Sequence, residues 1–251
     1  MQDGAQGVRP IAAEEARDLL RISPVSAQGD LGYIDLLGDV PKGDLTLMQR
    51  TMRSKVIARI YHRLWRPFFV RLMFGWRGPR FREEQRMVMG MLSVSNGDRV
   101  LDVGCGPGTY TRPIAEAAGD GLVIGIDPST EMLDAALVKQ GMPNIAYVRG
   151  DAGALPFEDG VFDALCCSGA IHAMHDPERA LDEMVRVLGD GGRLALMAAC
   201  APEKGRRRHM GKGVTVFERD ELAEGLARRG LVGVEQVVFR RAQLVSARKG
   251  A

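Results

Sequence analysis

The sequence predicts a doubly wound α/β fold whose sheet is mostly parallel, with a mainly helical extension at the amino-terminal side. From about residue 99 onward, short apolar runs alternate with helical patterns at regular spacing, which is typical of consecutive βαβ units. One apolar run, residues 100–103, leads directly into a glycine-rich turn. The composition, with 45% hydrophobic and 26% charged residues, is that of an ordinary globular protein. A chain of 251 residues can therefore form one main core with an appendage.

Five apolar runs of strand length form the predicted parallel sheet, at residues 99–103, 122–126, 145–149, 164–167 and 193–197. Helical patterns separate the strands at residues 109–118, 132–140 and 177–188. Pro177 suits the first position of its helix, because an N–H group there would have no partner within the helix.

The last part of the chain predicts a mixed edge of the sheet. A helix is expected at residues 218–229, and two apolar runs follow at 231–239 and 243–248. A parallel return needs a crossover of a dozen or more residues, so two strands this close in sequence must be antiparallel.

Residues 1–98 follow a different pattern. A short helix is expected at 14–22, a strand or hairpin arm at 31–37, and one or two helices at 46–74, which Pro67 kinks or divides. We therefore divide the chain into an amino-terminal segment at 1–44, a helical segment at 45–98 and the α/β domain at 99–251.

Composition and charge exclude some classes of protein. The first nine residues hold no apolar run of a signal peptide, and no stretch approaches the roughly 18 apolar residues that span a bilayer, so we expect a cytoplasmic protein. The net charge of +2 indicates no particular partner. The cysteines form no Cys-x-x-Cys pair, which favours buried free thiols over a disulfide or a metal site; they are Cys105, Cys166, Cys167 and Cys200.

The strongest motif is the glycine turn after the first predicted strand. Gly104, Gly106 and Gly108 follow the mostly apolar run 100–103 and open a helical pattern. Such turns let a ligand approach the backbone at a helix N-terminus, and alone they are weak evidence. The spacing G-x-G-x-G differs from the G-x-G-x-x-G of dinucleotide enzymes, which weakens the interpretation as an NAD protein.

Acidic residues at the ends of the next strands strengthen the signal. Asp127 closes the second predicted strand, where a carboxylate can accept hydrogen bonds from both ribose hydroxyls. Asp151 follows the third strand and could accept from an exocyclic amine of an adenine, while the small Ala152 leaves room for the ring. The alternative is that Asp stands at these positions because turns favour it.

With these residues, the sequence resembles the class I S-adenosylmethionine-dependent methyltransferases, especially the branch that contains the ubiquinone and menaquinone C-methyltransferases. The segments that carry the resemblance are VLDVGCGPGTYT, IGIDPSTEML, GDAGALPFEDGVFDALCC and RVLGDGGRLAL, within residues 100–196. The resemblance implies a seven-stranded, Rossmann-like sheet with an antiparallel last strand, and S-adenosylmethionine as cofactor.

The same resemblance implies a set of cofactor contacts. Gly104 and Gly106 would pass beside the methionyl part and Asp127 would hold the ribose. Met132 would pack near the adenine, which Asp151 and Ala152 would frame. The implied contacts also include Asp102, Pro128 and, through its backbone at the methionyl end, Cys167.

The segment after the fourth strand holds the candidate catalytic residue. His172 matches a histidine common in the family at this point, and it is a candidate general base or substrate anchor. The alternative is a histidine that packs locally. For His175 and Asp176, capping of the next helix is the favoured interpretation. The chain has no Asn/Asp-Pro-Pro-Tyr/Phe motif of base-modifying enzymes and no cluster of acids for a divalent metal, so we expect metal-independent methyl transfer.

The amino-terminal part leaves several interpretations open. Ser23 and Ser26 stand where some relatives have the cysteines of a zinc knuckle, so 1–44 would be a degenerate module without metal. Residues 45–98 are expected to form an amphipathic lid over the active site. An anionic membrane surface or RNA are the less favoured partners for its basic residues. These residues include Arg50, Arg53, Lys55, Arg59, Arg63, Arg66 and Arg71, and a second basic stretch lies at 204–209.

The sequence thus favours an enzyme that methylates a small organic acceptor, either a natural product or a quinone-like compound. An RNA-modifying methyltransferase, and a protein that uses the sulfonium for chemistry other than methylation, are the alternatives. The acceptor atom is left open between carbon, oxygen and nitrogen, and the oligomeric state between monomer and homodimer.

Overall fold

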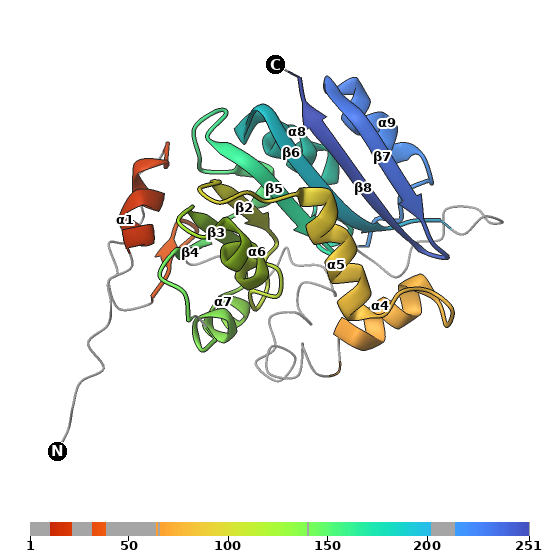
Figure 1. The fold of residues 1–251 in the computed structure, drawn as a ribbon, viewed down its shortest axis with the longest axis horizontal. Coiled ribbons are helices and arrows are strands. Elements are labelled where there is room, and N and C mark those ends of the chain that lie inside the picture. Colours follow the sequence, from red (N-terminus) through yellow and green to blue (C-terminus); the bar gives the residue numbers. More distant parts are fainter. Residues whose placement is uncertain are drawn as a thin grey trace.

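The computed structural model describes residues 11–21, 32–38, 64, 66–139, 141–201 and 214–250. Figure 1 shows a twisted sheet packed against helices. Its eight strands follow the order β1-β4-β3-β2-β5-β6-β8-β7. In chain order, the strands are β1 (Ile34–Asp35), β2 (Val100–Val103), β3 (Val123–Asp127), β4 (Ile145–Arg149), β5 (Phe162–Ser168), β6 (Leu188–Ala199), β7 (Leu231–Val238) and β8 (Ala242–Lys249).

The described helices are α1 (Ile11–Asp18), α4 (Arg66–Phe74), α5 (Phe81–Leu92), α6 (Thr111–Ala118), α7 (Thr130–Leu137), α8 (Pro177–Val187) and α9 (Glu221–Arg228), with the short 3-10 helices η3 (Ala152–Ala154) and η4 (Ile171–Ala173). None of the helices in these described stretches combines the length and the apolar character needed to cross a bilayer.

The predicted α/β fold is confirmed. The predicted strand at 145–149 has the bounds of β4, and the other predicted strands and helices of the α/β domain differ from the observed ones mainly at their ends. The largest difference is β6, which begins at Leu188, directly after α8. The helix α5 was not identified as a separate element by the sequence pattern.

The sheet separates two hydrophobic cores. Alternate residues of a strand point to opposite faces. Leu101 and Val103 accordingly enter one core together with α1, α8 and α9, while Val100 enters the other with α4, α5, α6 and α7. Helices therefore cover both faces, as in a doubly wound fold.

The mixed edge follows the prediction from loop length. β8 pairs antiparallel with both β6 and β7, whereas the other paired strands are parallel. Only the turn 239–241 separates β7 from β8, which is too short for a parallel crossover.

The amino-terminal residues add an eighth strand to the seven that were expected. Ile34 and Asp35 form β1, which pairs parallel with β4 at the edge of the sheet. The Asp35 carboxylate lies 2.8 Å from Nη1 of Arg149, and both side chains are largely buried. The predicted strand or hairpin arm at 31–37 is therefore an edge strand of the main sheet.

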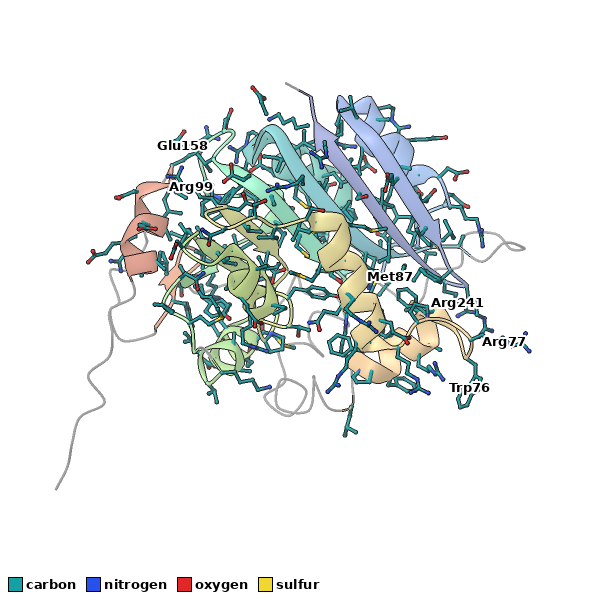
Figure 2. All side chains as sticks on the ribbon, viewed as in Figure 1. Trp76, Arg77, Met87, Arg99, Glu158 and Arg241 are labelled. Carbon is teal, nitrogen blue, oxygen red and sulfur yellow. The ribbon has the colours of Figure 1, made fainter. Side chains whose placement is uncertain are left out.

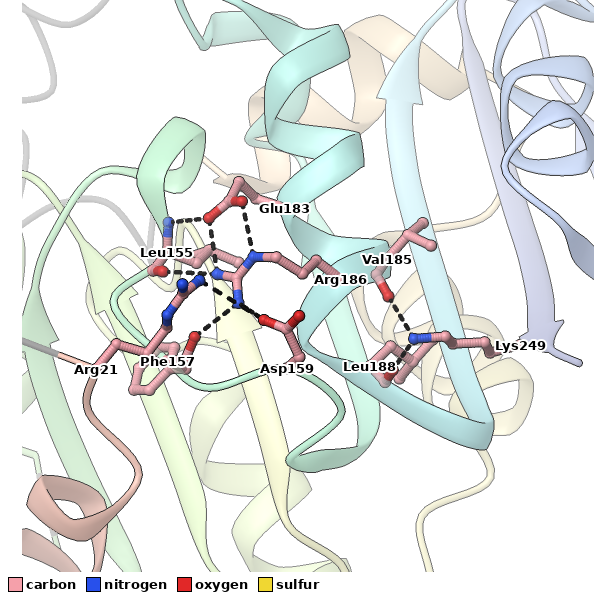
Figure 3. Close-up of polar contacts among 9 residues, drawn as sticks. All are labelled: Arg21, Leu155, Phe157, Asp159, Glu183, Val185, Arg186, Leu188 and Lys249. Carbon is pink, nitrogen blue, oxygen red and sulfur yellow. Dashed lines mark hydrogen bonds and ion pairs between the residues drawn. The ribbon is translucent and has the colours of Figure 1, made fainter. Parts of the chain in front are cut away.

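An arginine cluster joins α8 to the loop before β5 (Figure 3). The Arg186 guanidinium donates hydrogen bonds of 2.8 Å to the carbonyl oxygens of Leu155 and Phe157. It also pairs with Glu183 and Asp159 at 2.8 and 2.6 Å, and these carboxylates raise its pKa. The cluster fixes the loop that follows η3 against the helix that follows η4.

Candidate functional site

The predicted site residues converge at one edge of the sheet. β4, β3, β2 and β5 are neighbours and run parallel, so their carboxyl ends lie side by side. The glycine turn follows β2, Asp127 ends β3, and Asp151 follows β4. The segment with His172 follows β5. Open α/β sheets bind ligands at this edge.

Backbone hydrogen bonds hold the glycine turn against β3. Gly104 and Gly106 have φ angles of 69° and 53°, in the left-handed region that favours glycine. The Gly104 N–H donates to the carbonyl oxygen of Ile126 at 2.8 Å, and the Gly106 N–H donates to Oδ2 of Asp127 at 2.9 Å. The turn therefore presents its backbone directly beside the Asp127 carboxylate.

Asp127 links this turn to the next helix. Its Oδ1 accepts a hydrogen bond of 2.9 Å from the Ser129 N–H, while Oδ2 accepts from Gly106. The Ser129 hydroxyl in turn caps α7 by accepting from the N–H of the buried Met132 at 3.3 Å. These contacts orient the Asp127 carboxylate at the end of β3.

The residues predicted to frame an adenine lie next to Asp127. The Gly150 N–H donates to the Asp127 carbonyl oxygen at 3.3 Å, which places Asp151 beside the end of β3. The exposed Asp151 caps η3 through Gly153, and Ala152 is partly buried. The exposed Pro128 contributes its carbonyl oxygen to a hydrogen bond from Nε of Arg149. The structure thus shows Asp151 in a turn-capping contact. Its contact with a ligand stays a prediction.

Asp102 is a buried carboxyl at the base of the glycine turn. It lies within β2, and Oδ2 accepts a hydrogen bond of 2.6 Å from the Thr111 hydroxyl. Burial raises the pKa of Asp102 from 3.8 to about 7, against the opposing effect of Thr111, and the nearby Asp127 charge raises it further. Near neutral pH, both the protonated and the ionised forms of Asp102 are therefore populated.

We expect Asp102→Asn to become relatively more stable than the wild type as the pH rises. Between about pH 4 and 7 the folded protein holds a proton on Asp102 that the unfolded chain releases, so this group lowers wild-type stability as the pH rises through that window. The gap should grow by a few kcal/mol between pH 5 and 8, at about 1.4 kcal/mol for each unit of the shift. Urea unfolding at both values measures it. Parallel pH dependences in wild type and variant would contradict this prediction, and the exposed Asp134→Asn serves as control.

His172 lies in η4 with a fully enclosed imidazole. The side chain is 1% exposed, and neither ring nitrogen has a hydrogen-bond partner among the described residues. Its ring stacks on that of Phe69 from α4, with the ring centres 5.7 Å apart and the planes 9° from parallel. Burial, and then the charge of Arg66, lowers the pKa of His172 to about 4. The imidazole is therefore neutral at physiological pH.

A buried ion pair ties the helical segment to the end of β5. Nη2 of Arg66 donates hydrogen bonds of 3.0 Å to Oε1 of Glu84 and to Oγ of Ser168. The Ser168 hydroxyl also donates to the same Glu84 oxygen at 3.2 Å. Arg66 and Glu84 are 2% and 0% exposed. A β-carbon at Gly169 would collide with the Arg66 guanidinium, so the arginine requires a glycine there.

The sequence pattern does not predict this cluster. Arg66 is one of several basic residues of 46–74 that look alike in sequence, and no motif links it to Glu84 or Ser168. Glu84 and Ser168 lie 18 and 102 residues after Arg66, so no local sequence pattern could pair them with it. The only usable signal was the position of Ser168 at the carboxyl end of a predicted strand.

The remaining predictions concern cysteines and metal. The four cysteines are free and buried, and burial raises the pKa of the Cys167 thiol to about 12. In the described part of the chain, no group of three or more His, Cys, Asp or Glu side chains could hold a metal ion. Ser23, Ser26, residues 46–63 and the basic stretch 204–209 lie outside the described residues.

A shallow cleft of about 310 Å³ lies between α5 and α6. Phe81, Gln85, Thr109 and Arg112 are among its lining residues, and it includes none of the predicted site residues.

The fold and the glycine turn first define a general class, the Rossmann-like α/β proteins. Residues 101–196 match the family model described as a methyltransferase domain. A demethylmenaquinone methyltransferase of Renibacterium salmoninarum is 39% identical over 124 residues, which are 49% of this chain and 51% of the relative. The match thus spans about half the length of that relative.

Two further comparisons cover more of the chain. An uncharacterized methyltransferase of Schizosaccharomyces pombe is 30% identical over 74% of this chain and 67% of its own. The crystal structure of a SAM-dependent methyltransferase from Aquifex aeolicus has a TM-score of 0.59 and 22% identity, over 78% of this chain and 98% of that one, and so shares the fold. The chain belongs to the S-adenosylmethionine-dependent methyltransferases.

The residues at the strand ends fit the cofactor of this family, S-adenosylmethionine. A β-carbon at Gly106 would meet no atom of the described residues within 4 Å, so there is room beside the turn whose amide contacts Asp127. The oriented carboxylate suits a hydroxyl-bearing sugar, and the buried Asp102 suits a cationic group nearby. Gly104, Gly106 and Asp127 are thus the residues that would hold the cofactor.

Proposed function

We propose that this chain transfers a methyl group to a small organic acceptor of aromatic or quinone-like character, without a metal ion. The observation that carries the proposal is the buried His172 imidazole beside the aromatic ring of Phe69, because its two nitrogens lack hydrogen-bond partners in the described part of the chain. A buried polar group without partners costs free energy, so its presence here favours a role toward a ligand over local packing.

The chemistry divides between cofactor and protein. When bound, S-adenosylmethionine supplies a methyl group on a sulfonium, which is already an activated donor. The protein must hold the acceptor in line and exclude water. Phe69 offers a ring face on which a planar acceptor can stack. The neutral His172 can accept the proton that the acceptor loses as its bond to the methyl carbon forms.

We further propose that residues 45–98 act as the lid of this site. α4 contributes Phe69 against η4, and Arg66 and Glu84 join α4 and α5 to Ser168. The described lid residues therefore contact the end of β5 and the segment that follows it, where the acceptor would lie. Phe69→Ala should raise the KM for an aromatic acceptor more than it changes cofactor affinity.

Demethylmenaquinone is the first acceptor to test, because the Renibacterium relative is named for it. Incubation of the purified chain with S-adenosylmethionine and a panel of small aromatic acceptors should yield a product that is one methyl group heavier by mass spectrometry. Methyl label that enters ribosomal or transfer RNA, and none of the small acceptors, would instead support the RNA-modifying alternative.

Asp127→Ala should weaken binding of S-adenosylhomocysteine by about 2–3 kcal/mol, since it removes a charged acceptor of hydrogen bonds. Titration calorimetry measures the loss. The exposed Asp134→Ala on α7 is the matched control and should bind as the wild type does. Equal affinities of the wild type and Asp127→Ala would refute the assignment.

A further inference from the structure

The helix α4 departs from the usual amphipathic arrangement, because apolar side chains also lie on its exposed side. Its charged first residue, Arg66, is 2% exposed, whereas Phe68 and Leu72 are 64% and 42% exposed. Val70, Met73 and Phe74 on the other side are buried in the core. A helix that is apolar on all sides is normally buried on all sides. The exposed apolar side of α4 therefore requires an explanation beyond the packing of this domain.

The exposed apolar residues lie in α4 and just beyond its two ends. Phe68 and Leu72 are four residues apart within α4, so their side chains lie above one another on the helix. Leu64 precedes the helix and Trp76 follows it in the next turn. We call these four residues the α4 apolar face. Trp76 is the most prominent of them, with 83% of its surface exposed. Figure 2 shows Trp76 at a corner of the molecule, pointing away from the sheet.

Basic side chains border the Trp76 end of this face. The Arg71 guanidinium lies 4.8 Å from the centre of the Trp76 ring. Arg77 and Arg241 project at the same corner in Figure 2, and the Arg240 side chain passes beside Gly75. Between residues 45 and 82 the sequence has no Asp or Glu. The basic residues of that stretch are Arg50, Arg53, Lys55, Arg59, Arg63, Arg66, Arg71, Arg77, Arg80 and Arg82.

We propose that the α4 apolar face and its arginines dock the protein on the surface of an anionic lipid bilayer. Apolar side chains with a tryptophan, bordered by arginines, match an interface that is apolar inside and negatively charged outside. The positive charge of the arginines favours an anionic bilayer over the other possible partners of this face. A second copy of the chain would bring arginines against arginines, and residues 46–63 of the same chain are themselves basic without an acid.

The docking surface adjoins the site described above. Phe69, which stacks on His172, is the neighbour of Phe68 in the same helix. If the proposed function holds, a lipid-dissolved acceptor would reach the site from the side that faces the bilayer. The docking itself does not depend on methyl transfer, and the test below measures binding alone.

The test is co-sedimentation of the full chain with vesicles of phosphatidylcholine containing about one third phosphatidylglycerol, compared with pure phosphatidylcholine. We expect binding to the anionic vesicles, and we expect 0.5 M salt to weaken it because salt screens the arginines. The double variant Phe68→Ser/Trp76→Ser should lower the partition coefficient at least about tenfold, since each aromatic ring loses its burial in the bilayer. Both side chains are exposed in the free protein, so its thermal midpoint should hardly change.

A matched control separates the docking face from exposed apolar surface in general. Val138→Ser removes an apolar side chain that is 85% exposed at the end of α7, and it should bind vesicles as the wild type does. Arg71→Gln/Arg77→Gln should reduce the preference for anionic over neutral vesicles. The tryptophan emission should shift to shorter wavelength with vesicles in the wild type, and less so in Trp76→Ser.

Three results would overturn the proposal. The first is no sedimentation with anionic vesicles. The second is equal binding by wild type and Phe68→Ser/Trp76→Ser. The third is a dimer in light scattering that dissociates in this double variant, which would assign the α4 apolar face to contact between copies. None of these results bears on whether the purified chain methylates a soluble acceptor.

Discussion

His172→Ala is expected to lower the rate of methyl transfer by about 100- to 10,000-fold, the usual contribution of a positioned general base. Cofactor affinity should stay within about twofold, because the predicted cofactor contacts of Asp127 and the glycine turn do not involve His172. The expected loss is therefore in kcat at saturating cofactor. Steady-state kinetics together with calorimetry on the same variant separates the two quantities.

The neighbouring histidine provides the control. His175 is exposed and only three residues away, so His175→Ala should keep wild-type turnover. If both variants lose activity equally, the segment after β5 has lost its structure and the base assignment fails. If neither loses activity, His172 only packs against Phe69.

The pH dependence gives His172 a second signature. Its lowered pKa places the acid limb of kcat/KM near pH 4 and not near 6.5, because only the neutral imidazole accepts a proton. Between pH 4 and 6.5, His172 binds a proton in the unfolded chain but stays neutral in the folded chain. Stability should therefore fall by about 1.4 kcal/mol per unit as the pH drops from 6.5 towards 4. His172→Phe should remove this part of the acid sensitivity.

Arg66→Met should destabilise the fold by about 3–5 kcal/mol, because it leaves the Glu84 carboxylate buried without its ion pair. Glu84 is 0% exposed, so water cannot replace the lost partner without a rearrangement of α4 and α5. Chemical unfolding with urea measures the change. The exposed pair of Arg228 and Glu224 supplies the control, and Arg228→Met should change stability by less than about 1 kcal/mol.

Two further measurements test the role of the pair beyond stability. Arg66→Met/Glu84→Met should regain part of the lost stability, since no buried charge remains unpaired. Wherever Arg66→Met still folds, the pKa of His172 should rise, because the guanidinium charge contributes to its depression. The contrary result is that Arg66→Met lowers stability by less than about 1 kcal/mol and leaves the His172 pKa unchanged. That result would show that Arg66 neither fixes the lid to β5 nor lowers the pKa of His172.

Much of the α/β domain could be predicted because its signals are local. The alternation of apolar runs with helical periods gave the parallel strands, and the short connection between 231–239 and 243–248 required an antiparallel pair. The edge strand β1 was harder to predict, because two residues carry little periodicity. Its register with β4 brings Asp35 against Arg149, and these two residues are 114 positions apart in the sequence.

The sequence by itself determined the fold class, the family resemblance and the cofactor, because spaced glycines and acids at strand ends are read within short segments. Tertiary structure alone decided which side chains are buried together. The basic residues of 46–74 look alike in sequence, yet Arg66 is enclosed with Glu84 and Ser168 while Arg71 lies beside the exposed Trp76. The physical reason is that the cost of burying a charge depends on the partners that the fold brings to it, and those partners come from distant parts of the chain.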